Sequence, residues 1–210
     1  MRGSTVSRFL QLAGAHASHP RYVPRYFRNL FVPPIVSGLP WFTFGAIDFL
    51  HSWMRLDHKV FEYGCGGSTL FFAARAASVT CVEHNRNWMQ SVIAALAERR
   101  LGNVHIRHEP AGREPPLSDS TYCRALDQPF DVIVVDGWAL GKCTDDDRRA
   151  VMSRAACFAR AEKFVLPGGI IVLDDAWFDP GLEHHARDRL SFRGVGPWRS
   201  GVSRTDVFFY

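Results

Sequence analysis

Between residues 58 and 175, short apolar runs alternate with longer stretches in which apolar side chains recur every three or four positions. Short apolar runs bounded by turn residues are typical of buried strands, and the longer stretches are typical of amphipathic helices. Such alternation indicates an α/β fold with a largely parallel sheet. The strands are expected at 59–64, 78–84, 103–109, 130–137 and 168–175.

Helices are predicted between these strands and before the first one. The expected ranges are 43–55, 68–77 and 87–100, with a further helix from the acidic triplet at 145–147 to about residue 164. Ser68 is a suitable N-cap for the second helix. Two extended runs at 189–198 and 204–210 are typical of an antiparallel hairpin. The predicted sheet is therefore seven-stranded and mostly parallel, with helices on its faces and a C-terminal antiparallel hairpin.

Residues 1–40 differ in composition from the rest of the chain. They contain five prolines mixed with aromatic and basic residues. Proline interrupts long helices, so we expect an N-terminal arm here and one domain over 41–210. The formal net charge is +4, and residues 1–30 hold five arginines and no acid, so the positive charge belongs to the arm. This excess is too small to imply nucleic acid by itself.

The overall composition indicates a soluble globular protein. Hydrophobic residues make up 47% and charged residues 22%, which excludes disordered and collagen-like classes. The five cysteines form no CxxC pair, which favours reduced thiols and a cytoplasmic location. The longest apolar runs are far shorter than the roughly 20 residues of a membrane helix, so we expect no membrane span.

The strongest local motif is the segment VFEYGCGGST at residues 60–69. A buried strand containing Glu62 ends in a turn with Gly64, Gly66 and Gly67, and a helix follows. Glycines allow a ligand to approach the main chain, where exposed N–H groups can bind it. A tight turn made only for packing has the same appearance.

The acidic residue Glu83 makes this motif more specific. A dinucleotide fingerprint would need a third glycine at Thr69, which disfavours a nicotinamide or flavin site. Glu83 ends the second strand, 17 positions after Gly66, where such folds place a carboxylate that accepts hydrogen bonds from both ribose hydroxyls. The pattern predicts a different nucleoside ligand.

In these features the chain resembles the class I S-adenosylmethionine-dependent methyltransferases. The resemblance rests on Glu62-x-Gly64-x-Gly66, Glu83, FDVIVVDG and PGGIIVLDD, and it covers about residues 58–210. It implies a Rossmann-like α/β fold and S-adenosyl-L-methionine as cofactor. It also implies that the glycine turn contacts the methionine part, that Glu83 holds the ribose, and that residues after the third strand contact the adenine. The cofactor-binding residues expected on this basis and from the turn are Glu62, Gly64, Cys65, Gly66, Gly67, Ser68, Glu83, His84, Glu109, Ala111 and Asp136.

Three aspartates form a second group at the ends of the fourth and fifth strands. Asp136, Asp174 and Asp175 should meet at the edge of the sheet where ligands bind. Ionised together they need a cation, and carboxylate oxygens suit Mg²⁺ better than zinc. The arrangement resembles the metal-dependent O-methyltransferases that act on catechols and sugars. The alternative is that Asp136 binds the amino group of the cofactor while Asp174 and Asp175 cap a loop.

The predicted reaction is methyl transfer from S-adenosylmethionine to an oxygen of a small molecule or sugar, with or without help from a divalent cation. Asp136 and Asp174 are the expected catalytic residues, and Asp136, Asp174 and Asp175 the expected metal ligands. Two aromatic groups, Trp138 and the pair Trp177 and Phe178, would wall the acceptor site.

Several alternatives stay open at this point. The adjacent histidines His184 and His185 could supply a general base or could be an exposed pair. An RNA or protein methyltransferase would use the basic arm to dock its substrate, and a catalytically silent module would keep the fold for partner recognition. We expect instead that the arm lies against the acceptor side and does not grip nucleic acid.

Overall fold

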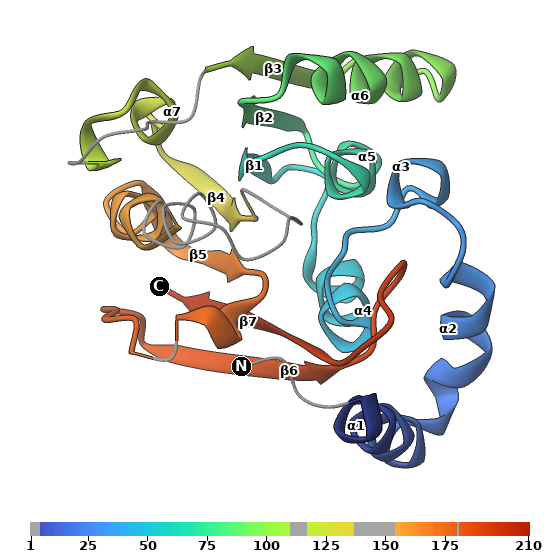
Figure 1. Cartoon of the computed structure of the whole chain (residues 1–210). Coiled ribbons are helices and arrows are strands. Elements are labelled where there is room, and N and C mark those ends of the chain that lie inside the picture. The colour runs from blue at the N-terminus through green and yellow to red at the C-terminus, as the bar shows by residue number, and fades with distance from the viewer. Residues whose placement is uncertain (1–4, 110–116, 137–153, 180) are drawn as a thin grey trace.

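The computed structural model describes residues 5–109, 117–136, 154–179 and 181–210. Seven strands form one sheet in the order β3-β2-β1-β4-β5-β7-β6 (Figure 1). Strands β1 to β5 are parallel, and β7 runs antiparallel to both β5 and β6. This confirms the predicted fold class. The strands are β1 (Lys59–Tyr63), β2 (Ser78–Glu83), β3 (Val104–His108), β4 (Phe130–Val135), β5 (Val165–Leu173), β6 (Asp188–Gly194) and β7 (Ser203–Phe209).

Helices cover both faces of the sheet because successive strand residues point to opposite sides. The helices α4 (Phe44–Trp53), α5 (Gly67–Ala73) and α6 (Arg86–Glu98) lie on one face, on the right in Figure 1. Their apolar side chains form a core with Val60 and its neighbours on that face. The short helix α7 (Thr121–Arg124) and the helical residues 154–161 cover the other face, where Phe61 is buried.

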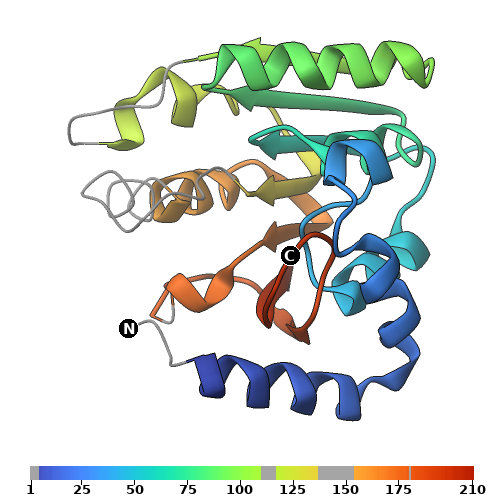
Figure 2. The same ribbon diagram turned by 45° about the vertical axis from the view of Figure 1, so that its right-hand side comes forward.

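The predicted strands and helices all correspond to observed elements where the structure describes them. The largest change at a strand end is in β6, which ends at Gly194 although its predicted run continues to residue 198. The strand β5 begins at Val165 rather than at residue 168. The predicted helix at 68–77 ends earlier, at Ala73. The expected start of the helix at 145–147 lies outside the described residues. The parallel strands point the same way (Figure 2), so the ends of β1, β2, β4 and β5 share one edge, called here the carboxyl edge.

The N-terminal segment consists of helices, and the expected interruption of long helices by proline is seen in the short elements that follow the first helix. It contains α1 (Thr5–Ser18), the 3-10 turn η1 (Pro20–Tyr22), α2 (Val23–Asn29) and α3 (Pro34–Ser37). The prolines of these elements lie in their first turns, where a missing N–H costs nothing.

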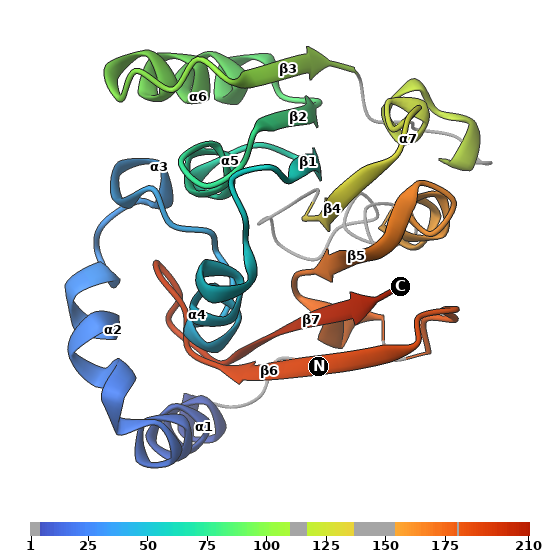
Figure 3. The same ribbon diagram turned by 180° about the vertical axis from the view of Figure 1, so that it is seen from behind.

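The N-terminal helices are joined to the core by aromatic side chains. Tyr22 and Tyr26 are buried, and the ring of Tyr22 lies 5.7 Å from that of Phe44 on α4. Figure 3 shows α1, α2 and α3 along one side of the molecule, from β6 to α5. In the described part of the chain, no helix is long and apolar enough to cross a membrane.

Candidate functional site

The turn after β1 is held by hydrogen bonds of its own residues. Gly64 has φ 94°, a left-handed conformation that favours glycine, and its N–H donates to the Val82 carbonyl oxygen at 2.8 Å. The Gly66 N–H donates to Thr69 Oγ1 at 2.9 Å, and this hydroxyl donates to Glu62 Oε2 at 2.6 Å. The carboxylate of Glu62 therefore fixes the shape of the turn through Thr69.

The start of α5 differs from the sequence prediction. The helix begins at Gly67, and Ser68 lies in its first turn with a hydrogen bond to Glu62. The N-cap is therefore Gly66 and not Ser68. The Gly66 N–H donates to the hydroxyl of Thr69. A Cβ atom on Gly67 would lie 2.2 Å from the Leu39 carbonyl oxygen, so the N-terminal segment packs directly on the glycine turn.

The Glu62 carboxyl is unusual because it is almost fully buried. Burial raises its pKa to about 7, while the hydrogen bonds from Ser68 and Thr69 act in the opposite direction. The negative charge of Glu83 adds to the increase. Near neutral pH, part of the Glu62 population is therefore protonated.

Glu83 lies across the turn at the end of β2, with only 4% of its surface exposed. Its Oε2 accepts from the Cys65 N–H at 3.2 Å, and its Oε1 accepts from the Asn85 N–H at 2.7 Å. The His84 Nδ1 atom lies 3.1 Å from Oε1. The two main-chain donors orient the carboxylate, and the Cys65 thiol also donates to Oε2 at 3.6 Å. A ribose hydroxyl would therefore share or replace the thiol and imidazole contacts. The orientation of the carboxylate fits the ribose role that the motif predicts.

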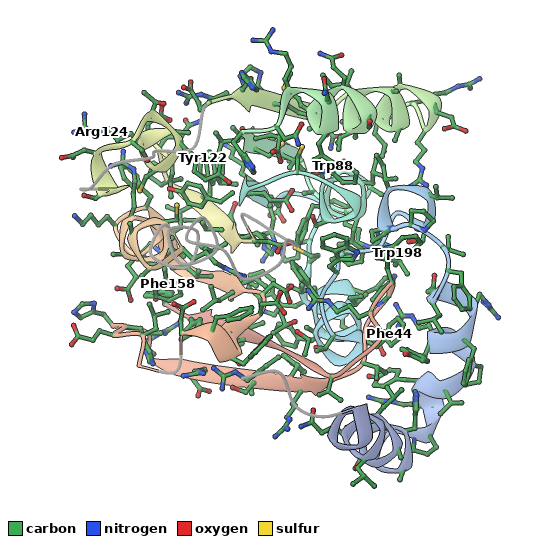
Figure 4. The ribbon with its side chains drawn as sticks, viewed as in Figure 1. Phe44, Trp88, Tyr122, Arg124, Phe158 and Trp198 are labelled. Carbon is green, nitrogen blue, oxygen red and sulfur yellow. The ribbon has the colours of Figure 1, made fainter. Side chains whose placement is uncertain are left out.

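The side chain of Trp88 packs on the glycine turn, and the side chain of Cys65, within the turn, is buried. Trp88 Nε1 on α6 donates to the Cys65 carbonyl oxygen at 2.6 Å, and a Cβ on Gly66 would touch its ring at 3.6 Å (Figure 4). The Cys65 thiol is buried, and its hydrogen bond with Cys81 and its burial both raise its pKa. Cys65 is therefore held as a neutral thiol and lacks the character of a nucleophile.

The remaining predicted cofactor residue beside β2 is Glu109. Its N–H donates to the Glu83 carbonyl oxygen at 3.0 Å, which places it beside Glu83 at the carboxyl edge. Its Oε1 lies 3.9 Å from Arg107 Nη2. Ala111 lies outside the described residues.

Asp136 lies between the glycine turn and the end of β5. Its N–H donates to the Tyr63 carbonyl oxygen, and the Asp174 N–H donates to that of Val135, both at 3.3 Å. Burial and the charge of Asp174 raise the pKa of Asp136 well above its usual range, while Arg154 and Arg199 lower it. A carboxyl group with a raised pKa is a stronger base than an exposed aspartate once it is ionised.

Asp174 and Asp175 are bound by an arginine that the sequence analysis missed. Arg199 Nη2 lies 2.6 Å from Asp174 Oδ2, and Arg199 Nη1 lies 2.5 Å from Asp175 Oδ1. Burial raises the pKa of Asp174 to about 6 even though Arg199 opposes it. At Asp175, burial acts upward, but the charge and hydrogen bonds of Arg199 lower the pKa overall.

The residues at the end of β5 do not fit the divalent cation that the sequence predicted. Asp174 Oδ1 accepts from Thr205 Oγ1 at 2.8 Å, and Asp175 Oδ1 accepts from Ser203 Oγ at 2.7 Å. With Arg199 on the other side, all four carboxylate oxygens have partners. Within the described residues, no group of three His, Cys, Asp or Glu side chains could hold a metal. The cation that these carboxylates need is supplied by the Arg199 guanidinium, so the expected Mg²⁺ is not supported.

The aromatic and histidine candidates lie at opposite ends of β5. Trp177 and Phe178 stack with ring centroids 3.9 Å apart, and Trp177 Nε1 donates to Asp175 Oδ1 at 3.1 Å. They are therefore next to the acidic pair, while Trp138 lies outside the described residues. His185 instead pairs with Glu162, which accepts from the Tyr210 hydroxyl near the start of β5. His185 is thus held away from the acidic pair, and the ring of His184 packs on that of Phe208 with centroids 4.9 Å apart. No contact among the described residues supports a general base at these histidines.

Three residues that contact the candidate site escaped the sequence analysis: Arg154, Arg199 and Thr205. Arg154 is 4% exposed and donates to the Asp174 carbonyl oxygen. One feature of the sequence could have indicated these contacts. The strand β7 begins with polar residues although it lies between β5 and β6 in the sheet. A buried polar residue in a central strand needs a partner, and the ends of β5 supply it.

Comparison with known proteins adds evidence for the fold. A protein assigned as an O-methyltransferase from Klebsiella pneumoniae matches with TM-score 0.57 and 16% identity, over 97% of this chain and 98% of that chain. The fold is that of a class I methyltransferase. SMU.1697c of Streptococcus mutans, assigned as a methyltransferase and solved in complex with SAH, matches with TM-score 0.56 and 10% identity, over 79% of this chain and 96% of that chain.

An rRNA methylase from Streptococcus thermophilus has a similar degree of likeness. Its TM-score is 0.55 at 12% identity, over 79% of this chain and 94% of that chain. No family model and no curated protein sequence matches the chain. The protein assigned as an O-methyltransferase and the rRNA methylase share the fold, so the fold alone does not identify the acceptor.

Proposed function

We propose that this protein transfers a methyl group from S-adenosylmethionine to an oxygen of a small molecule or sugar. The observation that carries the proposal is the pairing of the glycine turn with Glu83. The Cys65 N–H in the turn donates to the Glu83 carboxylate at 3.2 Å, so the two features that the sequence predicts to bind a nucleoside lie side by side. The seven-stranded fold and the methyltransferases that share it support the same activity.

The residues of this chain would hold the cofactor in the β1 and β2 half of the carboxyl edge. Gly64 and Gly66 let the main chain approach it, and Glu83 would accept hydrogen bonds from its ribose. When bound, S-adenosylmethionine supplies an electrophilic methyl group on a positively charged sulfur. The main work left to the protein is to align the acceptor and to remove its proton.

Asp136 is the group that we assign to proton removal. It lies between the cofactor half and the β5 end, and Trp177 and Phe178 at that end would form an aromatic wall for a ring-shaped acceptor. Asp174 is a less suitable base than the sequence suggested, because both of its oxygens already accept hydrogen bonds or ion pairs. We propose that Asp174 orients the site instead.

An RNA acceptor is the second candidate, and one observation favours it. Phe27 and Phe31 on and after α2 are 61% and 83% exposed, and the exposed Arg28 lies between them in sequence. Exposed aromatic rings beside arginine can bind unpaired bases. Proteins with this fold include an rRNA methylase, so the expectation that nucleic acid is an unlikely partner is not supported.

Calorimetry with S-adenosylhomocysteine tests the cofactor site. Glu83→Ala should weaken binding about 5- to 150-fold, the equivalent of about 1–3 kcal/mol, because charge-assisted hydrogen bonds are lost. Glu98→Ala, on the exposed end of α6, is the matched control and should bind as the wild type does. Unchanged affinity in Glu83→Ala would show that the site is wrongly placed.

Methyl transfer to a panel of catechols, sugars and RNA then separates the acceptors. Asp136→Asn should lower turnover by about 10²- to 10⁴-fold, the usual range for a lost general base, while S-adenosylhomocysteine still binds. Transfer to RNA that is reduced by Phe31→Ala would favour the second candidate. Cofactor binding without transfer to any acceptor would indicate a silent binding module.

A further inference from the structure

We propose that Arg199 is the resident cation of the acceptor side, so that a guanidinium takes the position that a divalent metal would otherwise fill. Arg199 is thus a positioning residue that holds the end of β5 beside Asp136. The inference deepens the proposed function and rests on it for the role of this side of the site. Its metal and stability measurements do not require methyl transfer.

The geometry is that of a fork shared between two carboxylates. Arg199 Nη1 and Nη2 lie 2.5 and 3.3 Å from the two oxygens of Asp175, and Nη2 also lies 2.6 Å from Asp174 Oδ2. Arginine presents planar, diverging donors that match carboxylates in this way, whereas a lysine offers a single point charge. One side chain therefore binds both acids at the end of β5.

Two hydroxyl groups of β7 also donate hydrogen bonds to these carboxylates, and a metal ion would have to displace them. Thr205 binds the free oxygen of Asp174, and Ser203 binds Asp175. Magnesium would need oxygen ligands at about 2.0–2.1 Å and near-octahedral geometry. A magnesium ion could bind here only if it displaced the guanidinium group of Arg199, whose positive charge repels the ion.

Burial makes the balance of charge important here. Asp174 has no exposed surface, and the side chains of Asp175 and Arg199 are 18% and 20% exposed. Removing one partner of such a buried pair leaves a charge without compensation, which is strongly destabilising. Arg154 donates to the main-chain oxygen of Asp174 and adds a second positive charge, so two arginines face the two carboxylates.

Two strained backbone positions lie at or next to this ion pair. The non-glycine residues with positive φ in the described chain are Arg100, Asp175 and Trp198. Asp175 accepts the ion pair, and Trp198 directly precedes Arg199. Left-handed conformations cost non-glycine residues free energy and persist where the surroundings fix them. Here the fixing contacts include the ion pair itself.

The turn that carries Arg199 is anchored on both sides by main-chain hydrogen bonds. The Phe44 N–H donates to the Val195 carbonyl oxygen at 2.9 Å, and the Trp198 N–H donates to that of Asn29 at 3.1 Å. Figure 4 shows Trp198 and Phe44 on the same side of the molecule. The N-terminal helices and α4 thus hold the turn, and the turn holds the acids.

The test uses the full chain after dialysis against a chelator, with Mn²⁺ as the probe. Mn²⁺ binding is followed by electron paramagnetic resonance, and melting temperatures are measured with chelator and with excess Mg²⁺. The wild type should bind no stoichiometric Mn²⁺ and should melt at the same temperature in both solutions. Arg199→Met should melt on the order of 10 °C lower in chelator and should gain Mn²⁺ binding and stability from Mg²⁺.

Two further variants keep the test decisive if Arg199→Met does not fold. Arg199→Lys should retain part of the stability without any metal. Arg199→Met combined with Asp175→Asn should relieve the repulsion, regain stability and lose Mn²⁺ binding. Arg55→Met removes an arginine from an exposed ion pair and is the matched control, with no expected change in melting or in metal binding.

Stoichiometric Mn²⁺ binding by the wild type, with loss of stability in chelator, would overturn the proposal. Wild-type melting in Arg199→Met without metal would overturn it as well, because no cation would then be needed. S-adenosylhomocysteine binding, measured on the same samples, should be unchanged by Arg199→Met. If no sample binds S-adenosylhomocysteine, the proposed function fails while the result on Arg199 stands.

Discussion

The two halves of the carboxyl edge bind their carboxylates with different kinds of donors. At the end of β2, Glu83 is bound by main-chain N–H groups of Cys65 and Asn85. At the end of β5, Asp174 and Asp175 are bound by the side chains of Arg199, Ser203 and Thr205, which come from the C-terminal hairpin. The first half is shaped by local turns, and the second by tertiary contacts.

This difference indicates how each half should respond to substitution. In the β1 and β2 half, the main chain itself makes the contacts, so adding side-chain atoms where the main chain packs closely should lower stability. In the β5 half, side chains make the contacts, so the loss of a single hydroxyl or guanidinium group should lower the free energy of unfolding. Each half can therefore be disturbed separately.

The largest effect is expected from Gly67→Ala in the first half. The new Cβ would lie 2.2 Å from the Leu39 carbonyl oxygen and 2.6 Å from that of Pro34, and main-chain atoms cannot move aside singly. We expect a loss of about 3 kcal/mol in the free energy of unfolding, together with weaker cofactor binding. Urea denaturation measures the loss.

Gly14→Ala is the matched control for this substitution. Its Cβ would meet nothing within 4 Å inside the helix α1, so the free energy of unfolding should rise by about 0.5–1 kcal/mol. If both variants unfold alike, the close packing of the N-terminal segment on the turn does not exist in solution.

The pH dependence of stability should come next in size, through Glu62. Its pKa is about 7 when folded against 4.5 as its reference value, so the folded state binds more protons between these pH values. Stability from this group is fully present below pH 4.5 and is lost as the pH rises through 7. The loss should be about 3 kcal/mol at most.

Glu62→Gln tests this assignment because glutamine stays neutral and can still accept from Thr69. The variant should show a smaller decline in stability between pH 5 and 7 than the wild type, because Asp136 and Asp174, whose pKa values are also raised, still contribute to it. Urea denaturation at several pH values measures both curves. Parallel curves would mean that Glu62 is ionised in the folded protein throughout this range.

The same contrast explains what the sequence could and could not predict. Strand positions follow from short apolar runs, and the placing of Glu83 and Asp136 follows from the rule that parallel strands end at one edge. Arg199 could not be found in this way. Its partners depend on the register of β7 against β5, in which Leu173 pairs with Asp206, and no local pattern near Arg199 encodes that register.

In the N-terminal segment, composition predicted an arm without long helices but not where its helices begin. Its prolines occupy first turns of short helices, and Tyr22 and Tyr26 join the core. Whether a proline breaks or begins a helix depends on where the chain turns, which composition does not show. The segment therefore supports the glycine turn and the hairpin from outside.

The smallest of these effects should come from Thr205→Val in the β5 half. Thr205 is fully buried, its hydroxyl donates to Asp174 Oδ1 at 2.8 Å, and it accepts from the Thr43 N–H at 3.1 Å. Valine keeps the shape and the preference for a strand but removes both bonds. The loss should be about 2 kcal/mol, since two buried polar groups lose one partner each. Thermal melting measures it, with Thr80→Val on β2 as a half-buried control expected to change by no more than about 0.5 kcal/mol. Because the contact lies in the second half, S-adenosylhomocysteine should bind Thr205→Val as tightly as the wild type. Weaker binding would mean that the two halves of the edge are coupled, and the separation drawn between them would fail.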